Sequence, residues 1–147
     1  MGHSFRHALI TVVVSAALPI ALGAYYPQQH QHPEGGAHHH PQAAKLKNPV
    51  AADAASIAAG QKLYGQHCAG CHGDAGHGDG AMGEDLTPKP SNLADADWKH
   101  GATDGEIFTV VRDGVKGTGM KAFRSKLTTH QLWDVVNYVR RIGPKRP

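Results

Sequence analysis

Apolar positions recur at helical spacing over residues 53–67. Ile57, Gly60 and Tyr64 follow one another at three- and four-residue steps, so they share one face of an amphipathic helix. Either Asp53 or Ser56 can cap the start of this helix, because a short polar side chain accepts a hydrogen bond from a free backbone N–H there. The pattern therefore predicts a first helix that ends near residue 67.

Two further helices are predicted downstream, each opened by a capping box. The sequences T-D-G-E at 103–106 and T-T-H-Q at 128–131 carry the reciprocal cap, and apolar residues follow each at helical spacing. Gly114 ends the second helix, and Gly143 with Pro144 ends the third near Ile142. No stretch alternates with a period of two, so we predict an all-α fold of three to five short helices.

Between the first and second helices, residues 70–90 are dominated by glycine and proline. A loop of this length inside a small domain is either disordered or wraps another group. Because three short helices alone would bury little apolar surface, the loop predicts that this domain folds around another group.

The N-terminal segment, residues 1–24, has the pattern of an export signal. Arg6 precedes an almost wholly apolar run over residues 8–23, and small residues allow cleavage after Gly23. Pro19 and the terminal position argue against a buried core helix. An uncleaved membrane anchor is the alternative, although the run is shorter than the roughly 20 residues that a spanning helix needs.

Residues 25–48 are rich in proline, glutamine, histidine and glycine and show no apolar periodicity, which predicts a flexible linker. Five histidines cluster in this segment: His30, His32, His38, His39 and His40. They either bind a transition metal or simply titrate in a solvated tail, and the tail is favoured because no cysteine or carboxylate cluster accompanies them. The folded domain is then expected over residues 49–147.

Overall charge and length limit the function classes. The chain has 147 residues and a formal net charge of +3, enough for one modest domain. This mild, evenly scattered positive charge does not favour nucleic-acid binding, although it can steer an anionic protein partner.

The main chemical signal is Cys68-Ala69-Gly70-Cys71-His72, which contains both cysteines of the chain. Two thiols at this spacing match the two vinyl groups of a heme, and the following histidine is then held beneath the iron. A redox-active dithiol is disfavoured because no βαβ pattern surrounds it, and zinc is disfavoured because no second C-x-x-C appears. The motif predicts one covalently attached heme, with Cys68 and Cys71 as thioether ligands and His72 as the proximal iron ligand.

A second axial ligand is expected from a methionine or a histidine. The candidates are Met82, Met120, His67, His77, His100 and His130. We favour Met120, because it lies in a glycine-flanked loop that can approach a porphyrin closely and far enough from His72 to reach the opposite face. Met82 is too near His72 in sequence to cross easily. The alternative for Met120 is that it fills a gap in the core.

Taken together, these residues resemble the class I cytochromes c over roughly residues 51–143. The stretch G-Q-K-L-Y-G-Q-H-C-A-G-C-H is similar to the first helix and heme-binding site of that family. The resemblance implies that the first and last helices cross at Gly60 and Tyr64, with Val135 and Tyr138 as partners on the last helix. It also places Met120 as the distal iron ligand.

Further contacts follow from this resemblance. In the family, a proline carbonyl accepts a hydrogen bond from the proximal histidine, and Pro90 is the best match, with Pro88 as the alternative. Trp98 and Arg112 are candidates to donate hydrogen bonds to the heme propionates. The alternative for Trp98 is a packing role, and the alternative for Arg112 is an ordinary solvated charge. Lys121 follows Met120 where many relatives have proline, so the ligand loop is expected to be looser.

The leading functional hypothesis is a monoheme carrier of single electrons, not an enzyme, exported to an oxidising compartment such as a bacterial periplasm. Its partners would be redox proteins that dock at the exposed heme edge, helped by lysines if these share a face: Lys89, Lys99, Lys116, Lys121 and Lys126. One alternative is a subunit of an oxidase or dehydrogenase complex, tethered to the membrane through its N-terminus. Another is a heme enzyme or gas sensor with an open distal position.

Overall fold

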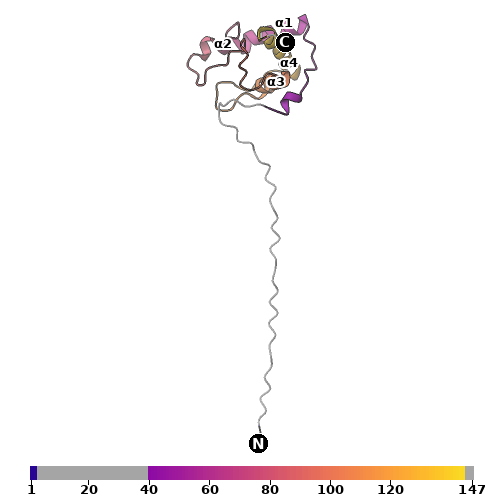
Figure 1. Ribbon diagram of the computed structural model, residues 1–147, viewed down its shortest axis with the longest axis vertical. Helices are drawn as coiled ribbons and strands as arrows, with labels where there is room; N and C mark the ends of the chain where they lie inside the picture. Colours follow the sequence, from indigo (N-terminus) through magenta and orange to yellow (C-terminus); the bar gives the residue numbers. More distant parts are fainter. Residues whose placement is uncertain (3–39, 145–147) are drawn as a thin grey trace. The chain divides into compact units, whose positions relative to one another are not determined.

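A computed structural model describes residues 1–2 and 40–144, so the predicted signal segment and most of the predicted linker lie outside the described residues. Residues 40–144 belong to one compact unit (Figure 1). Its α-helices are α1 (Ala54–His67), α2 (Ala69–His72), α3 (Asp104–Asp113) and α4 (Thr129–Ile142), with short 3₁₀ helices η1 (Ala43–Lys45) and η2 (Ala81–Gly83). No strand occurs in this described part, and the predicted all-α class is confirmed.

The three longer helices begin where their caps were predicted. The Asp53 carboxylate accepts from the Ser56 backbone N–H at 2.9 Å and opens α1. Both capping boxes are complete, one at the start of α3 and one at the start of α4. Gly114 and Gly143 follow the last residues of α3 and α4, as their positions indicated.

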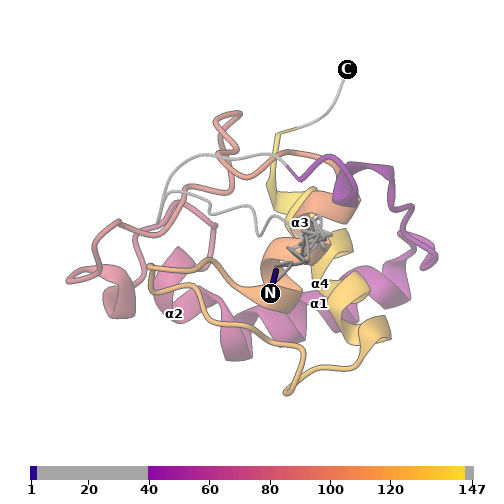
Figure 2. The same cartoon turned by 90° about the horizontal axis from the view of Figure 1, so that it is seen from below.

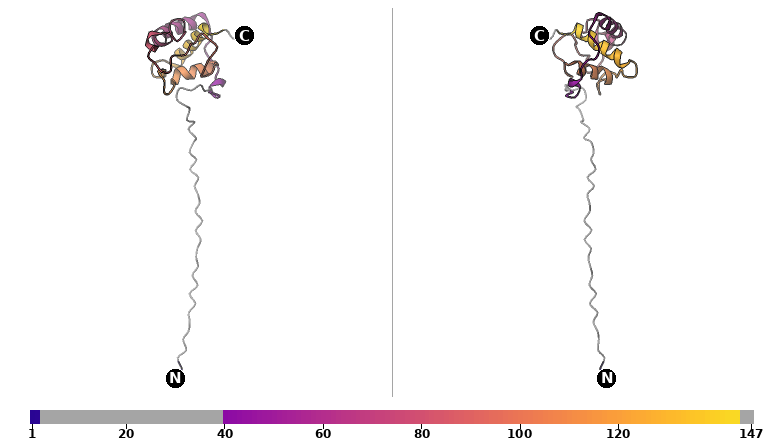
Figure 3. Two further views of the ribbon diagram at one scale, coloured as in Figure 1. Left: turned by 60° about the vertical axis from the view of Figure 1, so that its left-hand side comes forward. Right: turned by 90° about the vertical axis from the view of Figure 1, so that its right-hand side faces the viewer.

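Helices α1 and α4 cross in close contact and form the centre of the domain (Figures 2 and 3). The crossing lies at Gly60, where an added Cβ would stand only 2.0 Å from the Asp134 carbonyl oxygen and 2.9 Å from Tyr138 Cβ. Four residues later, the rings of Tyr64 and Tyr138 lie 5.2 Å apart between centroids. The predicted contacts of Gly60 and Tyr64 with the last helix are therefore present, with Asp134 as an additional partner.

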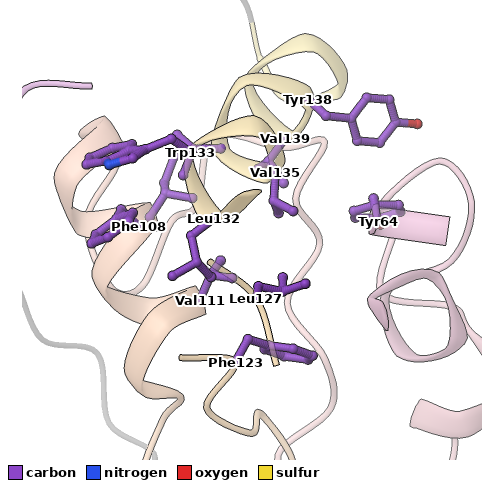
Figure 4. Packing of buried hydrophobic residues seen from close by; sticks show 12 residues of the cluster. Tyr64, Phe108, Val111, Phe123, Leu127, Leu132, Trp133, Val135, Tyr138 and Val139 are labelled. Carbon is purple, nitrogen blue, oxygen red and sulfur yellow. The ribbon is translucent and has the colours of Figure 1, made fainter. Parts of the chain in front are cut away.

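The hydrophobic core fills the space between α3, α4 and the C-terminal half of α1 (Figure 4). Phe108 of α3 stacks on Trp133 of α4 at 4.0 Å between ring centroids. Val135 and Val136 are almost completely buried, and Phe123 and Leu127 close the core from the segment that precedes α4. The predicted apolar positions of α4 are thus buried, but residues 132–139 are buried without a break, so the middle of the helix is enclosed on every side, including the polar Asp134 and Asn137.

The domain begins earlier than residue 49. Ala43 of η1 is buried, and its carbonyl oxygen lies so near Gly105 of α3 that a Cβ there would be 1.9 Å away. Asn48 donates to the Asn137 side chain of α4 at 2.7 Å. The prediction of a flexible linker is therefore wrong for residues 40–48, because this segment packs against α3 and bonds to α4.

The segment is anchored to a buried polar group at the α1–α4 crossing. Asn137 Nδ2 donates to Ser56 Oγ at 2.9 Å, and Ser56 Oγ donates to the Asp134 carboxylate at 2.6 Å. All three side chains are buried, so these hydrogen bonds satisfy groups that would otherwise be costly to remove from water.

Replacing Gly60 with valine is expected to destabilise the domain by about 3 kcal/mol or more, because the new side chain would collide with the backbone of α4. Gly65→Ala is the matched control on the same helix, since nothing lies within 4 Å of its added Cβ, and it should stabilise by about 0.5–1 kcal/mol. Urea denaturation of the two heme-loaded variants measures both effects. Equal midpoints for Gly60→Val and the parent chain would show that the crossing tolerates a larger residue.

None of the helices in residues 40–144 combines the length and apolar content needed to cross a bilayer.

Candidate heme site

The C-x-x-C-H motif forms a single helical turn directly after α1. Cys68 ends α1 with its N–H bonded to the Tyr64 carbonyl at 2.8 Å, and its φ of −121° bends the chain before α2 begins. Within the turn, His72 N–H donates to the Cys68 carbonyl at 2.9 Å. Gly73, with a φ of +76°, ends the turn in a conformation that suits glycine. The two thiols and the imidazole are thereby held on one short, rigid element.

The two cysteines are free thiols, each partly buried. Burial raises the pKa of the Cys68 thiol to about 12, and the neighbouring Cys71 adds to this effect. A redox-active dithiol needs the opposite shift, since its attacking cysteine works as a thiolate. The surroundings of Cys68 therefore argue against the dithiol alternative and suit a thiol that is consumed in a covalent bond.

The predicted proximal ligand, His72, is oriented by a backbone carbonyl. His72 Nδ1 lies 3.0 Å from the Ser91 carbonyl oxygen. A carbonyl only accepts hydrogen bonds, so Nδ1 carries the hydrogen and Nε2 keeps a lone pair for a metal. Burial lowers the pKa of His72, which also favours the neutral ring that a metal requires.

The acceptor differs from the predicted one by a single residue. The Pro90 carbonyl faces Gly78, where an added Cβ would be 2.5 Å from its oxygen, so Pro90 does not accept from His72. The adjacent carbonyl of Ser91 points to the imidazole instead. The predicted role of Pro90 is wrong in this respect, although Pro90 stays in the site: its ring packs where Gly83 leaves room.

The glycine-rich loop after the motif lies closely on the backbone of α2. Gly78 N–H donates to the His72 carbonyl at 2.8 Å, and Gly80 N–H donates to the Cys71 carbonyl at 3.1 Å. A Cβ on Gly80 would stand 2.4 Å from the Gly70 carbonyl oxygen. The loop is thus an ordered cover of the C-x-x-C-H turn, and it needs glycine to approach so closely.

The two candidate methionines have very different surroundings. Met120 is partly buried and packs against the core, in a loop where its carbonyl accepts from Val115 N–H at 3.0 Å and its N–H donates to Thr118 Oγ1 at 3.1 Å. Met82 is 73% exposed, and its sulfur lies beside Gly70. Burial and loop geometry therefore support Met120 over Met82 as a distal ligand.

The donor set fits a covalently attached heme. It consists of two partly buried free thiols and a neutral imidazole whose Nδ1 hydrogen is already bonded, all on one turn. The zinc alternative gains no support within residues 40–144, where no group of three or more histidine, cysteine, aspartate or glutamate side chains is arranged to hold a metal ion.

Comparison with known proteins decides the family. The model of a family described as cytochrome c oxidase, cbb3-type, subunit III matches residues 55–139, which run from the start of α1 to the last turn of α4. The chain belongs to this family. It is a c-type cytochrome.

A curated relative of this cytochrome comes from Azospirillum sp. (strain B510) and is named cbb3-type cytochrome c oxidase subunit CcoP. The two sequences are 33% identical over 96 residues, which cover 65% of this chain and 32% of the relative. The cytochrome thus spans about a third of the length of that relative.

Solved structures show the same fold. A chain of the Kuenenia stuttgartiensis reducing HAO-like protein complex superposes with a TM-score of 0.62 at 26% identity, over 69% of this chain and 49% of that one. Cytochrome cL from Methylophaga aminisulfidivorans superposes with a TM-score of 0.51 at 25% identity, over 65% of this chain and 57% of that one. The helical architecture of the cytochrome is therefore shared with other c-type cytochromes.

The two candidate propionate donors bond elsewhere in the structure. Trp98 Nε1 donates to the Asp95 carbonyl at 2.7 Å, and its ring lies under the Arg140 guanidinium at 5.5 Å. Arg112 forms two hydrogen bonds to Asp113, which lowers the pKa of that carboxyl. Propionate contacts by Trp98 and Arg112 stay predictions, and each donor would have to leave or share its present acceptor to make them.

Proposed function

We propose that this cytochrome carries single electrons on one covalent heme, with His72 and Met120 as the axial iron ligands. The observation that carries the proposal is the C-x-x-C-H turn itself, in which two free thiols precede an imidazole fixed at 3.0 Å to the Ser91 carbonyl. The family membership and the partial burial of Met120 support it.

When bound, the heme supplies a one-electron Fe(III)/Fe(II) couple. The residues of the chain set how that couple works. The Ser91 carbonyl fixes the ring orientation and raises the basicity of His72. Hydrogen bonds to the backbone of Met120 order the loop that carries the thioether, and a neutral thioether would favour ferrous iron. If His72 and Met120 both bound the iron, no position would remain for a substrate, and the cytochrome would act as a carrier rather than as an enzyme.

An optical and redox titration of the heme-loaded protein tests this function. We expect one heme per chain, a single one-electron step, and a ferric spectrum with a sulfur-to-iron charge-transfer band at neutral pH. A second heme, a high-spin ferric spectrum, or rapid carbon monoxide binding by the reduced protein would contradict the proposal and favour an open distal site.

A second candidate is a place within a membrane oxidase complex. The name of the Azospirillum relative, an oxidase subunit, favours it, and so does the export-type pattern of residues 1–24. We propose export, followed by work either as a free carrier or as a tethered subunit. Mass spectrometry of the mature N-terminus, combined with separation of membranes from the soluble fraction, distinguishes the two: cleavage near Gly23 with recovery in the soluble fraction indicates the free form.

A further inference from the structure

Two loops with opposite charge flank the C-x-x-C-H turn and Met120. Residues 73–88, called here the acidic loop, contain no lysine or arginine. Its carboxylates are all exposed: Asp74, Asp79, Glu84 and Asp85. Residues 114–127, called here the basic loop, contain no aspartate or glutamate. Its cations are also all exposed: Lys116, Lys121, Arg124 and Lys126.

The acidic loop and the basic loop meet beside Met120. A Cβ on Gly119 would stand 2.5 Å from Leu86 Cδ1, so the Leu86 side chain lies directly on the residue that precedes Met120. Figure 2 shows both loops reaching to the same side of the helical core, the side on which α2 lies. One end of the domain therefore carries negative charge on the acidic loop and positive charge on the basic loop.

An exposed apolar side chain lies within the acidic loop. Met82 is the one large hydrophobic residue that is exposed in residues 47–144, and its sulfur lies against Gly70, between the two cysteines. Thioether bonds from Cys68 and Cys71 would bring an edge of the heme next to Met82. An apolar contact surrounded by charge is typical of surfaces that dock another protein.

Neighbouring charges of opposite sign reduce the charge of each loop but do not cancel it. The Lys89 amine donates to the Glu84 carbonyl, which places one cation at the end of the acidic loop. Arg124 pairs with Asp113 at 3.1 Å, which offsets one cation of the basic loop. Lys126 lies over the Phe123 ring at 5.7 Å, still exposed, and Lys121 is exposed directly after Met120.

We propose that this end of the cytochrome is a docking face with two halves of opposite charge. The proposal rests on the electron-carrier function above. The redox partner that fits places a basic patch against the acidic loop and an acidic patch against the basic loop, with an apolar contact at Met82. Such an arrangement fixes the orientation of the partner, because a rotated partner would meet like charges. It replaces the expected lysine ring, since Lys89 contacts the acidic loop rather than the basic one.

Paramagnetic ions of opposite charge map the two halves. The probes are hexacyanochromate(III) and tris(ethylenediamine)chromium(III), added at low ionic strength to the reduced, ¹⁵N-labelled heme protein. The anion is expected to broaden amide signals of residues 114–127 and the cation those of residues 73–88. Broadening of one loop by both ions, or of neither loop by its own ion, would overturn the proposal.

Variants with a single reversed charge test which loop each ion contacts. Lys121→Glu should weaken broadening by the anion only, and Asp85→Lys should weaken broadening by the cation only. Lys47→Glu and Asp97→Lys are matched controls, since both side chains are exposed and lie outside the two loops. Neither control should alter either pattern.

The same variants are then oxidised with hexacyanoferrate(III) and with tris(phenanthroline)cobalt(III), each of which takes one electron from the ferrous protein. Lys121→Glu should slow the anionic oxidant about threefold at low ionic strength and leave the cationic one unslowed, and Asp85→Lys should do the reverse. Equal effects on both oxidants would refute the two-halved face. Failure of both oxidants with the parent protein, while the ions still map to separate loops, would instead refute the carrier function.

Discussion

Replacing Cys68 and Cys71 together with serine is expected to abolish covalent heme attachment completely. A serine hydroxyl does not form the thioether bond, and these are the only cysteines in the chain. Each single variant should keep at most one bond. The intact mass of the exported protein measures the loss directly, and heme staining of a denaturing gel gives an independent reading.

The double variant should also lose much of its stability. The buried hydrophobic cluster draws its members from α1, α3, α4 and the segment before α4, and none comes from the acidic loop. That loop is held instead by contacts with α2, the turn that carries the two cysteines. In the proposed heme protein, the thioether bonds would fasten this turn to the heme. Thermal unfolding followed by circular dichroism should therefore occur at clearly lower temperature in the double variant.

Gly70→Ala is the matched control for the motif. The atoms nearest its added Cβ belong to the exposed, flexible side chain of Met82, with the sulfur at 2.6 Å, so that side chain can move aside. Full heme attachment in this variant, with none in the double serine variant, is the expected pair of results. A heme that stays bound through denaturation in the absence of both thiols would contradict the assignment of the motif.

The helices could be predicted because their signals are local. A capping box is complete within four residues, and the apolar face of α4 recurs over the length of the helix itself. The helix crossing at Gly60 could be predicted from the resemblance to the class I cytochromes c. Heme attachment could likewise be predicted from the C-x-x-C-H motif, because two thiols and an imidazole at that spacing have few other chemical uses.

Two features could not be predicted, because they depend on contacts distant in sequence. Whether Pro90 or Ser91 turns its carbonyl to His72 depends on the path of the loop over Gly78, which residue types alone do not specify. The packing of residues 40–48 was hidden by a composition typical of linkers. Only the fold brings Ala43 to Gly105 and Asn48 to Asn137, separated by dozens of residues.

Replacing Met120 with alanine is expected to remove the sulfur-to-iron charge-transfer band and to lower the reduction potential. A thioether stabilises ferrous iron, and its loss leaves water or another donor at the distal position. We expect a fall on the order of 100 mV or more, within the roughly 0.8 V over which axial ligands set heme potentials. The reduced variant should also bind carbon monoxide rapidly. Optical spectra and a potentiometric titration measure these changes.

Met82→Ala is the control with the same change of side chain. Because the Met82 side chain is exposed beside Gly70, its removal should leave the optical spectrum and the axial ligation unchanged. Loss of the charge-transfer band in Met82→Ala with its retention in Met120→Ala would reverse the assignment. If both variants kept the band, Met120 would not be required for sulfur ligation, and the assignment proposed for Met120 would be wrong. Since Met1 is the one other methionine in the chain, the pair of variants decides between the two methionines of the domain.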